Sequence, residues 1–418
     1  MAVRIHQEHP HVALLPSAGM GHLMPFLRLA SALATHGCQV TFIAAKPAVS
    51  DAESSHLSAL FSSHPQVHAL EFPVVTFGAT AKEVGLPSYI LFTSSARMLT
   101  LFAYLPTTTI ATTNRIGDVS IPGLPPLPLS MIPPALHDPA NLFTRQFFDN
   151  GRALLHANKI IVNTFENLEK EALAALNGGA VVHGLPPVVA VGPLPPLPPP
   201  PPPPPTPTTT MLAWLDGQPA RSVVYISFGS RTALSKAQSK ELGLGLEKSG
   251  HKFLWVVKSR AVDKEEEAGL EELLSHGFLD RIRGKGLVVN NWVDQDVVLS
   301  HGSIGAFISH CGWNSVLESI AHGVRILAWP RGADQRINSE IAERSGIGMW
   351  AREWGWSGDG EEEGLVRGEE IGELLGKLMV NRRVGECVAC VKEEAGRSVG
   401  VGGSSHVGIV GLIEEWKK

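Results

Sequence analysis

The sequence predicts an α/β protein built from two doubly wound, Rossmann-like domains. Short apolar, β-rich segments alternate with helical patterns along the chain, which is typical of parallel sheets covered by helices on both faces. A run of prolines divides the chain into two halves of similar size, and both halves show this alternation. We therefore expect two domains that face each other across a cleft, with ligands at the carboxyl ends of the strands.

The N-terminal half, residues 1–190, contains the first strand-like segments. They cover residues 11–18, 38–45, 67–75, 87–93, 159–165 and 187–193. The helical pattern between the first two ends at Gly37, a residue that commonly terminates helices. Residues 88–105 are interrupted by Ser94, Ser95 and Arg97, so we expect no membrane span there.

Residues 191–210 read VGPLPPLPPPPPPPPTPTTT and predict a linker. Consecutive prolines favour extended polyproline II, which makes a semi-rigid surface spacer; a ligand for an SH3-like domain is the alternative. Residues 211–418 form the second domain, with its last helix expected to pack back on the first. Its strand-like segments cover residues 222–230, 252–258, 287–293, 304–312 and 325–330.

The composition indicates an ordinary, slightly acidic globular protein. A net charge of -5 with 18% charged residues argues against nucleic acid or an anionic membrane as a partner. The N-terminus shows no apolar core of a signal peptide, so we expect a soluble, cytoplasmic protein. We also expect a monomer. Cys387 and Cys390 form a CxxC in a helical-looking segment, where two small residues on a helix face are favoured over a redox or metal role.

The stretch HCGWNSVLES, residues 310–319, lies on a predicted strand-to-helix turn. Unpaired backbone N–H groups and the helix dipole favour an anion at such a turn, and phosphate is the first expectation. A second glycine-serine turn, SFGS at 227–230, follows another strand, and Ser227, Ser230 and the Gly229 backbone suit a diphosphate.

The residue types from 292 to 335 suit the parts of a nucleotide sugar. An exposed Trp292 can stack on a base. Gln295 and Glu318 can bond ribose hydroxyls, whereas His310, Asn314 and Ser315 can bond phosphates. Asp334 and Gln335 can bond sugar hydroxyls.

The first strand ends in PSAGMGHLMPF, residues 16–26, which places His22 at the mouth of the following turn. Imidazole titrates near neutral pH, so His22 is either a general base or a surface or capping histidine. Met24 breaks the dinucleotide fingerprint, which disfavours an NAD-dependent enzyme.

The 44 residues from Trp292 to Gln335 resemble the signature box of plant family-1 UDP-glycosyltransferases, through the motifs W-x-x-Q, HCGWNS-x-x-E and a final D-Q. PSAGMGHLMPFLRLA is similar to the catalytic N-terminal segment of that family. SYILFTSSARM, DPANLFTRQF and HGSIGAFISHCGWNS are most similar to its flavonoid C-glucoside branch.

The resemblance implies a GT-B fold with the acceptor in the N-terminal domain and the UDP-sugar in the C-terminal one. UDP-glucose is then the donor substrate, a flavonoid-type polyphenol is the acceptor, and neither a cofactor nor a metal is needed. His22 deprotonates the acceptor in an inverting displacement. The residues implied to bind the donor are Ser230, Trp292, Val293, Gln295, His310, Gly312, Trp313, Asn314, Ser315, Glu318, Asp334 and Gln335.

One interval departs from the family pattern. Only GAT, near residues 77–81, separates VHALEFPVVTF from AKEVGLPSYILF. The family has a further strand here, ending in the aspartate that orients the catalytic histidine. A parallel crossover needs about a dozen residues, so the N-terminal sheet is expected to lack one strand. Asp118 and Asp138 are the nearest remaining acids in the sequence.

These observations predict a UDP-glucose-dependent C-glucosyltransferase with impaired turnover. Two alternatives remain open at this point: an O-glucosyltransferase for phenolics, because C- and O-transfer differ mainly in acceptor pose, and a catalytically weak UDP-sugar-binding variant.

Overall fold

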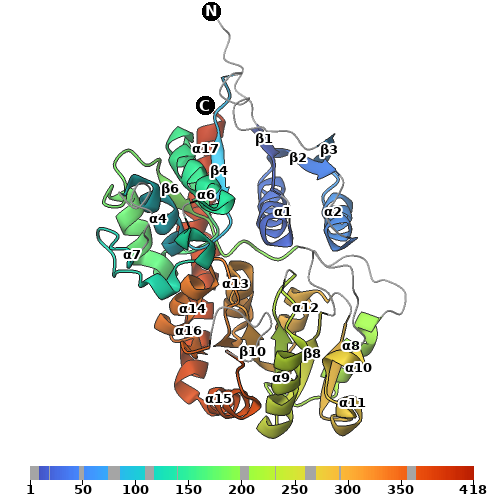
Figure 1. Ribbon diagram of the computed structural model, residues 1–418. Helices are drawn as coiled ribbons and strands as arrows, with labels where there is room; N and C mark the ends of the chain where they lie inside the picture. The colour runs from blue at the N-terminus through green and yellow to red at the C-terminus, as the bar shows by residue number, and fades with distance from the viewer. Residues whose placement is uncertain are drawn as a thin grey trace, which may run out of the picture. The chain divides into compact units, whose positions relative to one another are not determined.

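The computed structural model describes residues 9–17, 19–46, 51–73, 85–108, 117–138, 140–197, 207–230, 232–258, 270–290, 293–354 and 364–418. The chain forms two compact units. The N-terminal unit comprises Met1–Pro202 together with Glu394–Lys418, and the C-terminal unit comprises Pro203–Glu393. The C-terminal segment therefore belongs to the same unit as the first strands (Figure 1).

The described part of the N-terminal unit contains two separate three-stranded parallel sheets, with the orders β1-β2-β3 and β4-β5-β6. The strands are β1 (His11–Leu14), β2 (Gln39–Lys46), β3 (Val67–Pro73), β4 (Tyr89–Phe92), β5 (Lys159–Val162) and β6 (Val188–Ala190). The helices are α1 (Met20–Thr35), α2 (Asp51–Ser63), α4 (Ala96–Tyr104), α6 (Leu142–Ala153), α7 (Glu166–Asn177) and α17 (Ser404–Trp416), with short 3-10 turns η1 (Leu105–Thr107), η2 (Leu129–Met131), η3 (Pro134–His137) and η4 (Leu154–His156).

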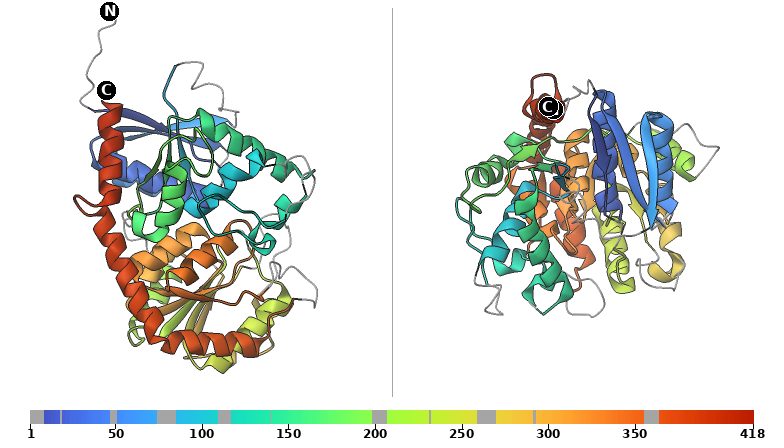
Figure 2. Two further views of the ribbon diagram at one scale, coloured as in Figure 1. Left: turned by 90° about the vertical axis from the view of Figure 1, so that its left-hand side faces the viewer. Right: turned by 90° about the horizontal axis from the view of Figure 1, so that it is seen from above.

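One hydrophobic core connects the two sheets of the N-terminal unit. Helices α1 and α2 lie beside β1, β2 and β3 (Figure 2). Leu14 of β1, Leu91 of β4, Ile161 of β5 and Ile409 of α17 belong to the same buried cluster. The two sheets are therefore held together by side-chain packing, and α17 completes that packing.

The C-terminal unit is built on a six-stranded parallel sheet with the order β12-β11-β10-β7-β8-β9. Its strands are β7 (Val223–Ser227), β8 (Lys252–Val256), β9 (Gly286–Val289), β10 (Ile304–Ser309), β11 (Arg325–Ala328) and β12 (Gly348–Trp350). Its helices are α8 (Pro207–Asp216), α9 (Lys236–Ser249), α10 (Leu270–Leu273), α11 (Phe278–Arg281), α12 (Gln295–Ser300), α13 (Trp313–His322), α14 (Gln335–Arg344) and α15 (Gly368–Val380). The last helix, α16 (Arg382–Val399), begins in this unit and ends in the other.

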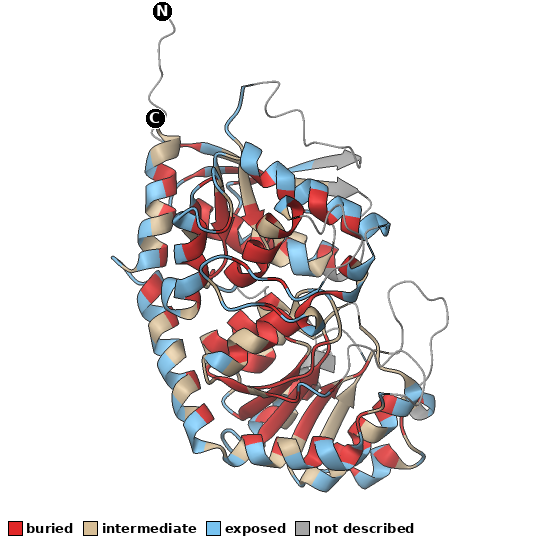
Figure 3. Cartoon of the chain, turned by 60° about the vertical axis from the view of Figure 1, so that its left-hand side comes forward, coloured by how far each residue is buried: buried red, intermediate tan, exposed pale blue. Residues whose placement is uncertain are grey.

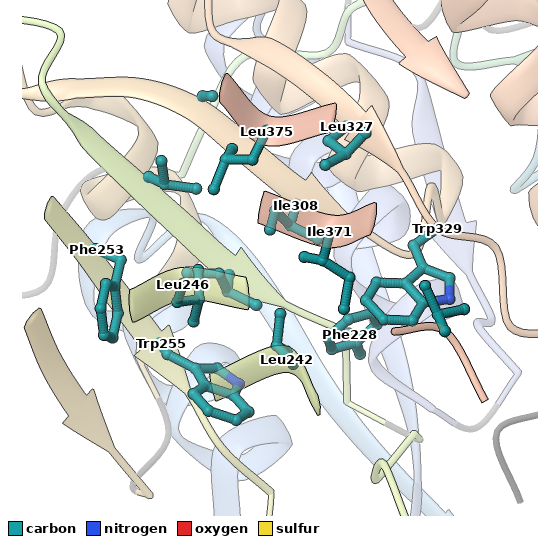
Figure 4. Packing of buried hydrophobic residues seen from close by; sticks show 14 of the residues in the cluster. Phe228, Leu242, Leu246, Phe253, Trp255, Ile308, Leu327, Trp329, Ile371 and Leu375 are labelled. Carbon is teal, nitrogen blue, oxygen red and sulfur yellow. The ribbon is translucent and has the colours of Figure 1, made fainter. Parts of the chain in front are cut away.

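The central strands of this sheet are buried on both faces, as their continuous apolar sequences predict (Figure 3). On one face, Trp255 and Phe253 of β8 and Ile308 of β10 pack with Leu242 of α9 and Ile371 of α15 (Figure 4). This rigid core fixes the carboxyl ends of β7 and β10, where the turns that bear the predicted phosphate ligands begin.

The expected fold class is confirmed in both units, and all eleven predicted strand segments contain a strand. Strand β12, which has three residues, was not predicted from the sequence. Cys387 and Cys390 lie on α16 with free thiols. Among the described helices none is long and apolar enough to span a bilayer. The short interval near residues 77–81 and the proline run at 198–206 lie outside the described residues.

Candidate functional site

The two predicted phosphate-binding turns are neighbours in the C-terminal unit. Strands β7 and β10 pair in parallel, with Ser227 opposite Ser309 at their carboxyl ends. SFGS follows the first strand and HCGWNS follows the second. Strand order reverses between these two strands, and such a switch point is where open α/β sheets bind ligands.

His310 lies between glycines of the two turns. A Cβ atom added to Gly229 or to Gly312 would stand 2.6 Å from His310 Nε2, so the backbone approaches the imidazole as closely as only glycine permits. Burial, together with the charge of Lys258, lowers the pKa of His310 to about 4. The imidazole is therefore neutral at pH 7 and offers a single N–H donor to a ligand.

Gln295 brings the predicted ribose-binding residues together. Its Nε2 donates hydrogen bonds to Ser315 Oγ at 2.8 Å and to Glu318 Oε2 at 2.7 Å. Gln295 opens α12, whereas Ser315 and Glu318 lie three residues apart on one face of α13. Glu318 is 6% exposed, so its carboxylate is a largely desolvated hydrogen-bond acceptor within this predicted ribose-binding group.

The predicted sugar-binding pair begins α14. Gln335 Oε1 accepts hydrogen bonds from the backbone N–H groups of Arg331 and Gly332, at 2.7 and 2.9 Å. Asp334 Oδ2 accepts one from Asn338 Nδ2 at 2.9 Å. The same Asn338 amide also donates a hydrogen bond to Cys311 in the HCGWNS turn, so it connects that turn to the D-Q turn.

Asn338 itself was not selected from the sequence. It is fully buried, and its Nδ2 also donates to the Cys311 carbonyl oxygen at 3.1 Å. Cys311 has a φ of 61°, a left-handed conformation that is unfavourable for residues other than glycine. Contacts with surrounding residues must therefore stabilise it. Asn338 supplies that support, since it fixes the backbone between His310 and Gly312.

The remaining residues predicted to bind the donor are Trp313, Val293, Asn314, Ser230 and Trp292. Trp313 is only 3% exposed, which limits the contact its indole can make with a sugar. Val293 is partly buried against the core of the unit. Asn314 lies in the first turn of α13 and Ser230 ends the SFGS turn. Trp292 lies outside the described residues.

Lys258 is a further charged residue at this edge, and it was not predicted from the sequence. It follows β8, and its Nζ donates a hydrogen bond to the Ser230 carbonyl oxygen at 2.7 Å. Burial lowers the pKa of Lys258. In the sequence the only signal was a cation at the end of a buried strand, which is too common a pattern to identify a site.

His22 lies in the first turn of α1, in the N-terminal unit, and its side chain is exposed. Its Nδ1 lies 2.8 Å from Oγ1 of Thr93, the residue that follows β4. The carboxylates of Asp118 and Asp138 instead accept backbone hydrogen bonds from Leu129 and Ala140 within their own loops. The described hydrogen bonds of both carboxylates lie within these loops, and none of them involves His22.

Comparisons with known proteins place this geometry in a family. Residues 203–356 match the family model described as UDP-glucoronosyl and UDP-glucosyl transferase. The UDP-glycosyltransferase CGT of Oryza sativa subsp. indica is 47% identical, with 95% of this chain and 94% of the relative covered. UDP-glycosyltransferase 708G2 of Citrus unshiu is 45% identical over 98% of this chain and 97% of the relative.

Solved structures agree. LpCGTa in complex with UDP is 44% identical and superposes with a TM-score of 0.84, covering 98% of this chain and 99% of that one. UGT71G1 of Medicago truncatula, complexed with UDP-glucose, is 28% identical with a TM-score of 0.85 over 98% of this chain and 99% of that one. The resemblance and the GT-B fold expected from the sequence are confirmed. The chain belongs to the plant family-1 UDP-glycosyltransferases, a family of hexosyltransferases.

Proposed function

We propose that the protein transfers glucose from UDP-glucose to a flavonoid-type polyphenol, a 2-hydroxyflavanone or a dihydrochalcone, as a C-glucoside. The observation that carries the proposal is the hydrogen-bonded group of Gln295, Ser315 and Glu318 beside the His310 turn. The similarity to the rice protein named CGT and to LpCGTa supports the C-linked product.

In the proposed donor site, each part of UDP-glucose meets a different group. Trp292 stacks on uracil beside Val293, while Gln295 and Glu318 bind the ribose. His310, Gly312, Asn314, Ser315 and Ser230 bind the diphosphate at the start of α13, where the helix dipole favours negative charge. Trp313, Asp334 and Gln335 contact the glucose. Lys258 adds a positive charge next to Ser230.

His22 is the proposed general base. The phenolic O–H bond breaks, the proton moves to His22, and the electron pair stays on the acceptor as a phenolate. Either the phenolate oxygen or the ring carbon ortho to it then attacks the anomeric carbon. The bond from the anomeric carbon to the diphosphate breaks, and UDP leaves with the electron pair. After attack by the ring carbon, that carbon still bears its hydrogen and the ring oxygen is a ketone. Loss of this proton to solvent and return of the proton from His22 to the oxygen restore the aromatic phenol. The α-linked donor thus gives a β-glucoside.

A catalytically weak UDP-sugar-binding protein is the second candidate. The match to the rice relative extends over 448 aligned positions, more than the 418 residues of this chain, so the relative contains residues that this chain lacks. The described strands of the N-terminal unit also form two sheets of three strands each. Both facts support a strand lost from the acceptor side and a turnover lower than that of the relatives.

Incubation with UDP-glucose and phloretin distinguishes the candidates. We expect a glucoside that survives acid hydrolysis, detected by mass spectrometry, because a C–C linkage resists acid whereas an O-glucoside is cleaved. An acid-labile product would instead indicate an O-glucosyltransferase. UDP binding without any product would leave the weak UDP-sugar-binding protein, and turnover equal to that of the rice relative would contradict the proposed impairment.

Gly229→Ala is expected to weaken UDP binding at least tenfold in isothermal titration calorimetry. The new methyl group would overlap His310 Nε2, and the φ of 79° at this position is unfavourable for alanine. Gly302→Ala is the matched control, because its Cβ would meet no atom within 4 Å. Equal UDP affinity in both variants would place the diphosphate away from this turn.

A further inference from the structure

A cavity of about 460 Å³ lies at the amino end of the sheet in the C-terminal unit. Arg221 precedes β7, Arg325 begins β11, and much of the remaining wall comes from α16. The predicted donor-binding turns follow the carboxyl ends of β7 and β10, at the opposite edge of the same parallel sheet. The cavity is therefore separate from the proposed UDP-glucose site.

Positive side chains dominate the wall of this cavity. Arg221, Arg325 and Lys392 line it, and none of the three forms an ion pair with a described carboxylate. Glu393 is the single acid among the residues that line the cavity. Positive charges that lack a counter-ion repel one another, so an anion in the cavity would be attracted by all three cations.

Arg325 is the least compensated of these cations. Its Nε is buried and has no hydrogen-bond partner among the described residues, and its Nη1 lies 3.5 Å from the Gly305 carbonyl oxygen. Burial, together with the charge of Arg221, lowers the pKa of Arg325. The guanidinium is thus partly desolvated with few hydrogen bonds from the protein to offset the cost, and a bound anion would supply that compensation.

Backbone oxygens at the end of α13 hold the other two cations. Arg221 Nη1 donates a hydrogen bond to the Gly323 carbonyl oxygen at 2.6 Å, and Lys392 Nζ lies 3.5 Å from the His322 carbonyl oxygen. Each side chain uses one donor in a described hydrogen bond, whereas a guanidinium and an ammonium each carry several. Both side chains are exposed, so they are oriented by the protein and retain donors for a ligand that enters from solvent.

We propose that this cavity binds a small organic phosphate. A phosphate monoester is a strongly charged anion at pH 7, and its oxygens match the paired N–H groups of arginine. The three cations would hold the phosphate, while Val388 and Ala389 of α16 contact the organic part. The volume of about 460 Å³ lies within the usual range for ligand pockets, which favours an organic phosphate over the bare ion. The proposal does not depend on glucose transfer.

Titration calorimetry with phenyl phosphate tests the proposal without any turnover. This probe joins one phosphate group to one apolar ring. We expect a site that Arg325→Gln weakens by about tenfold or more, the effect of one lost charge-assisted hydrogen bond. Inorganic phosphate should bind more weakly than phenyl phosphate, because it leaves the apolar wall uncovered.

Two neighbouring variants of α16 should change the affinity in opposite directions. Lys392→Gln should weaken the binding of phenyl phosphate about threefold and Glu393→Gln should tighten it about threefold, because the first removes an attractive charge and the second a repulsive one. A tighter site cannot result from a protein that fails to fold. Arg383→Gln is the matched control, since Arg383 is an exposed arginine of the same helix outside the cavity lining.

The Gly229→Ala variant distinguishes this cavity from the donor turn. The binding that depends on Arg325 should persist in Gly229→Ala, whose added methyl group lies beside His310 at the other edge of the sheet. Binding lost in Gly229→Ala but retained in Arg325→Gln would place the phosphate at the donor turn and overturn the proposal. Equal affinities for inorganic phosphate and phenyl phosphate would reject an organic ligand, and a Glu393→Gln protein that binds no tighter than the wild type would contradict the argument from charge.

Discussion

Replacing His22 with alanine is expected to lower kcat for glucose transfer by about 10² to 10⁴, the usual range for loss of a positioned general base. The dissociation constant for UDP should change less than twofold, because the proposed donor residues belong to the C-terminal unit and His22 to the N-terminal one. Stopped assays with phloretin and titration calorimetry with UDP measure the two quantities on the same protein.

The control for this variant is His183→Ala, which removes another exposed histidine of the N-terminal unit. Its kcat should equal that of the wild type. A His22→Ala protein that retains full activity would show that the acceptor loses its proton to another group or to solvent. The loss should also be smaller for the more acidic phenols, which ionise in water without a base.

The sequence was sufficient for those parts of the fold that depend on local patterns. Apolar runs such as KFLWVV and GAFIS predict buried parallel strands, and both form them as β8 and β10. The strand β12 was missed because three residues carry too little periodicity to stand out from their surroundings. The glycine signal at the end of the first helical pattern was also confirmed, since α1 ends at Thr35 and Gly37 has a φ of 82°.

The sequence could not predict which side chains of the site touch one another. Gln295 and Glu318 were both expected at the ribose, but their mutual hydrogen bond depends on how α12 packs beside α13. The contact of His22 with Thr93 and the bridging role of Asn338 likewise arise from tertiary structure. Such pairings join residues far apart in the chain, and no local pattern encodes them.

Glu318→Ala is expected to raise the dissociation constant for UDP by roughly 10- to 100-fold, which corresponds to loss of a charge-assisted hydrogen bond. Glu318 is 6% exposed, so its carboxylate is already desolvated before UDP binds and gains fully from a hydroxyl donor. The substitution also deprives the Gln295 amide of an acceptor 2.7 Å away. Titration calorimetry measures the affinity, and Glu370→Ala, which removes an exposed carboxylate of the same unit, should bind UDP as the wild type does.

The ribose contact can be isolated with 2′,3′-dideoxyuridine diphosphate in a cycle of two proteins and two ligands. If Glu318 binds the ribose hydroxyls, the analogue should bind the wild type and Glu318→Ala with similar, weak affinity, because the hydroxyl partners are absent in both cases. An equal loss for UDP and for the analogue would show that Glu318 acts only by holding Gln295 in place. Glu318→Gln separates the effect of the carboxylate charge from that of the hydrogen bond. Its amide oxygen still accepts a hydrogen bond from Gln295 but carries no charge. An affinity close to that of the wild type would mean that the hydrogen bond matters and the carboxylate charge does not.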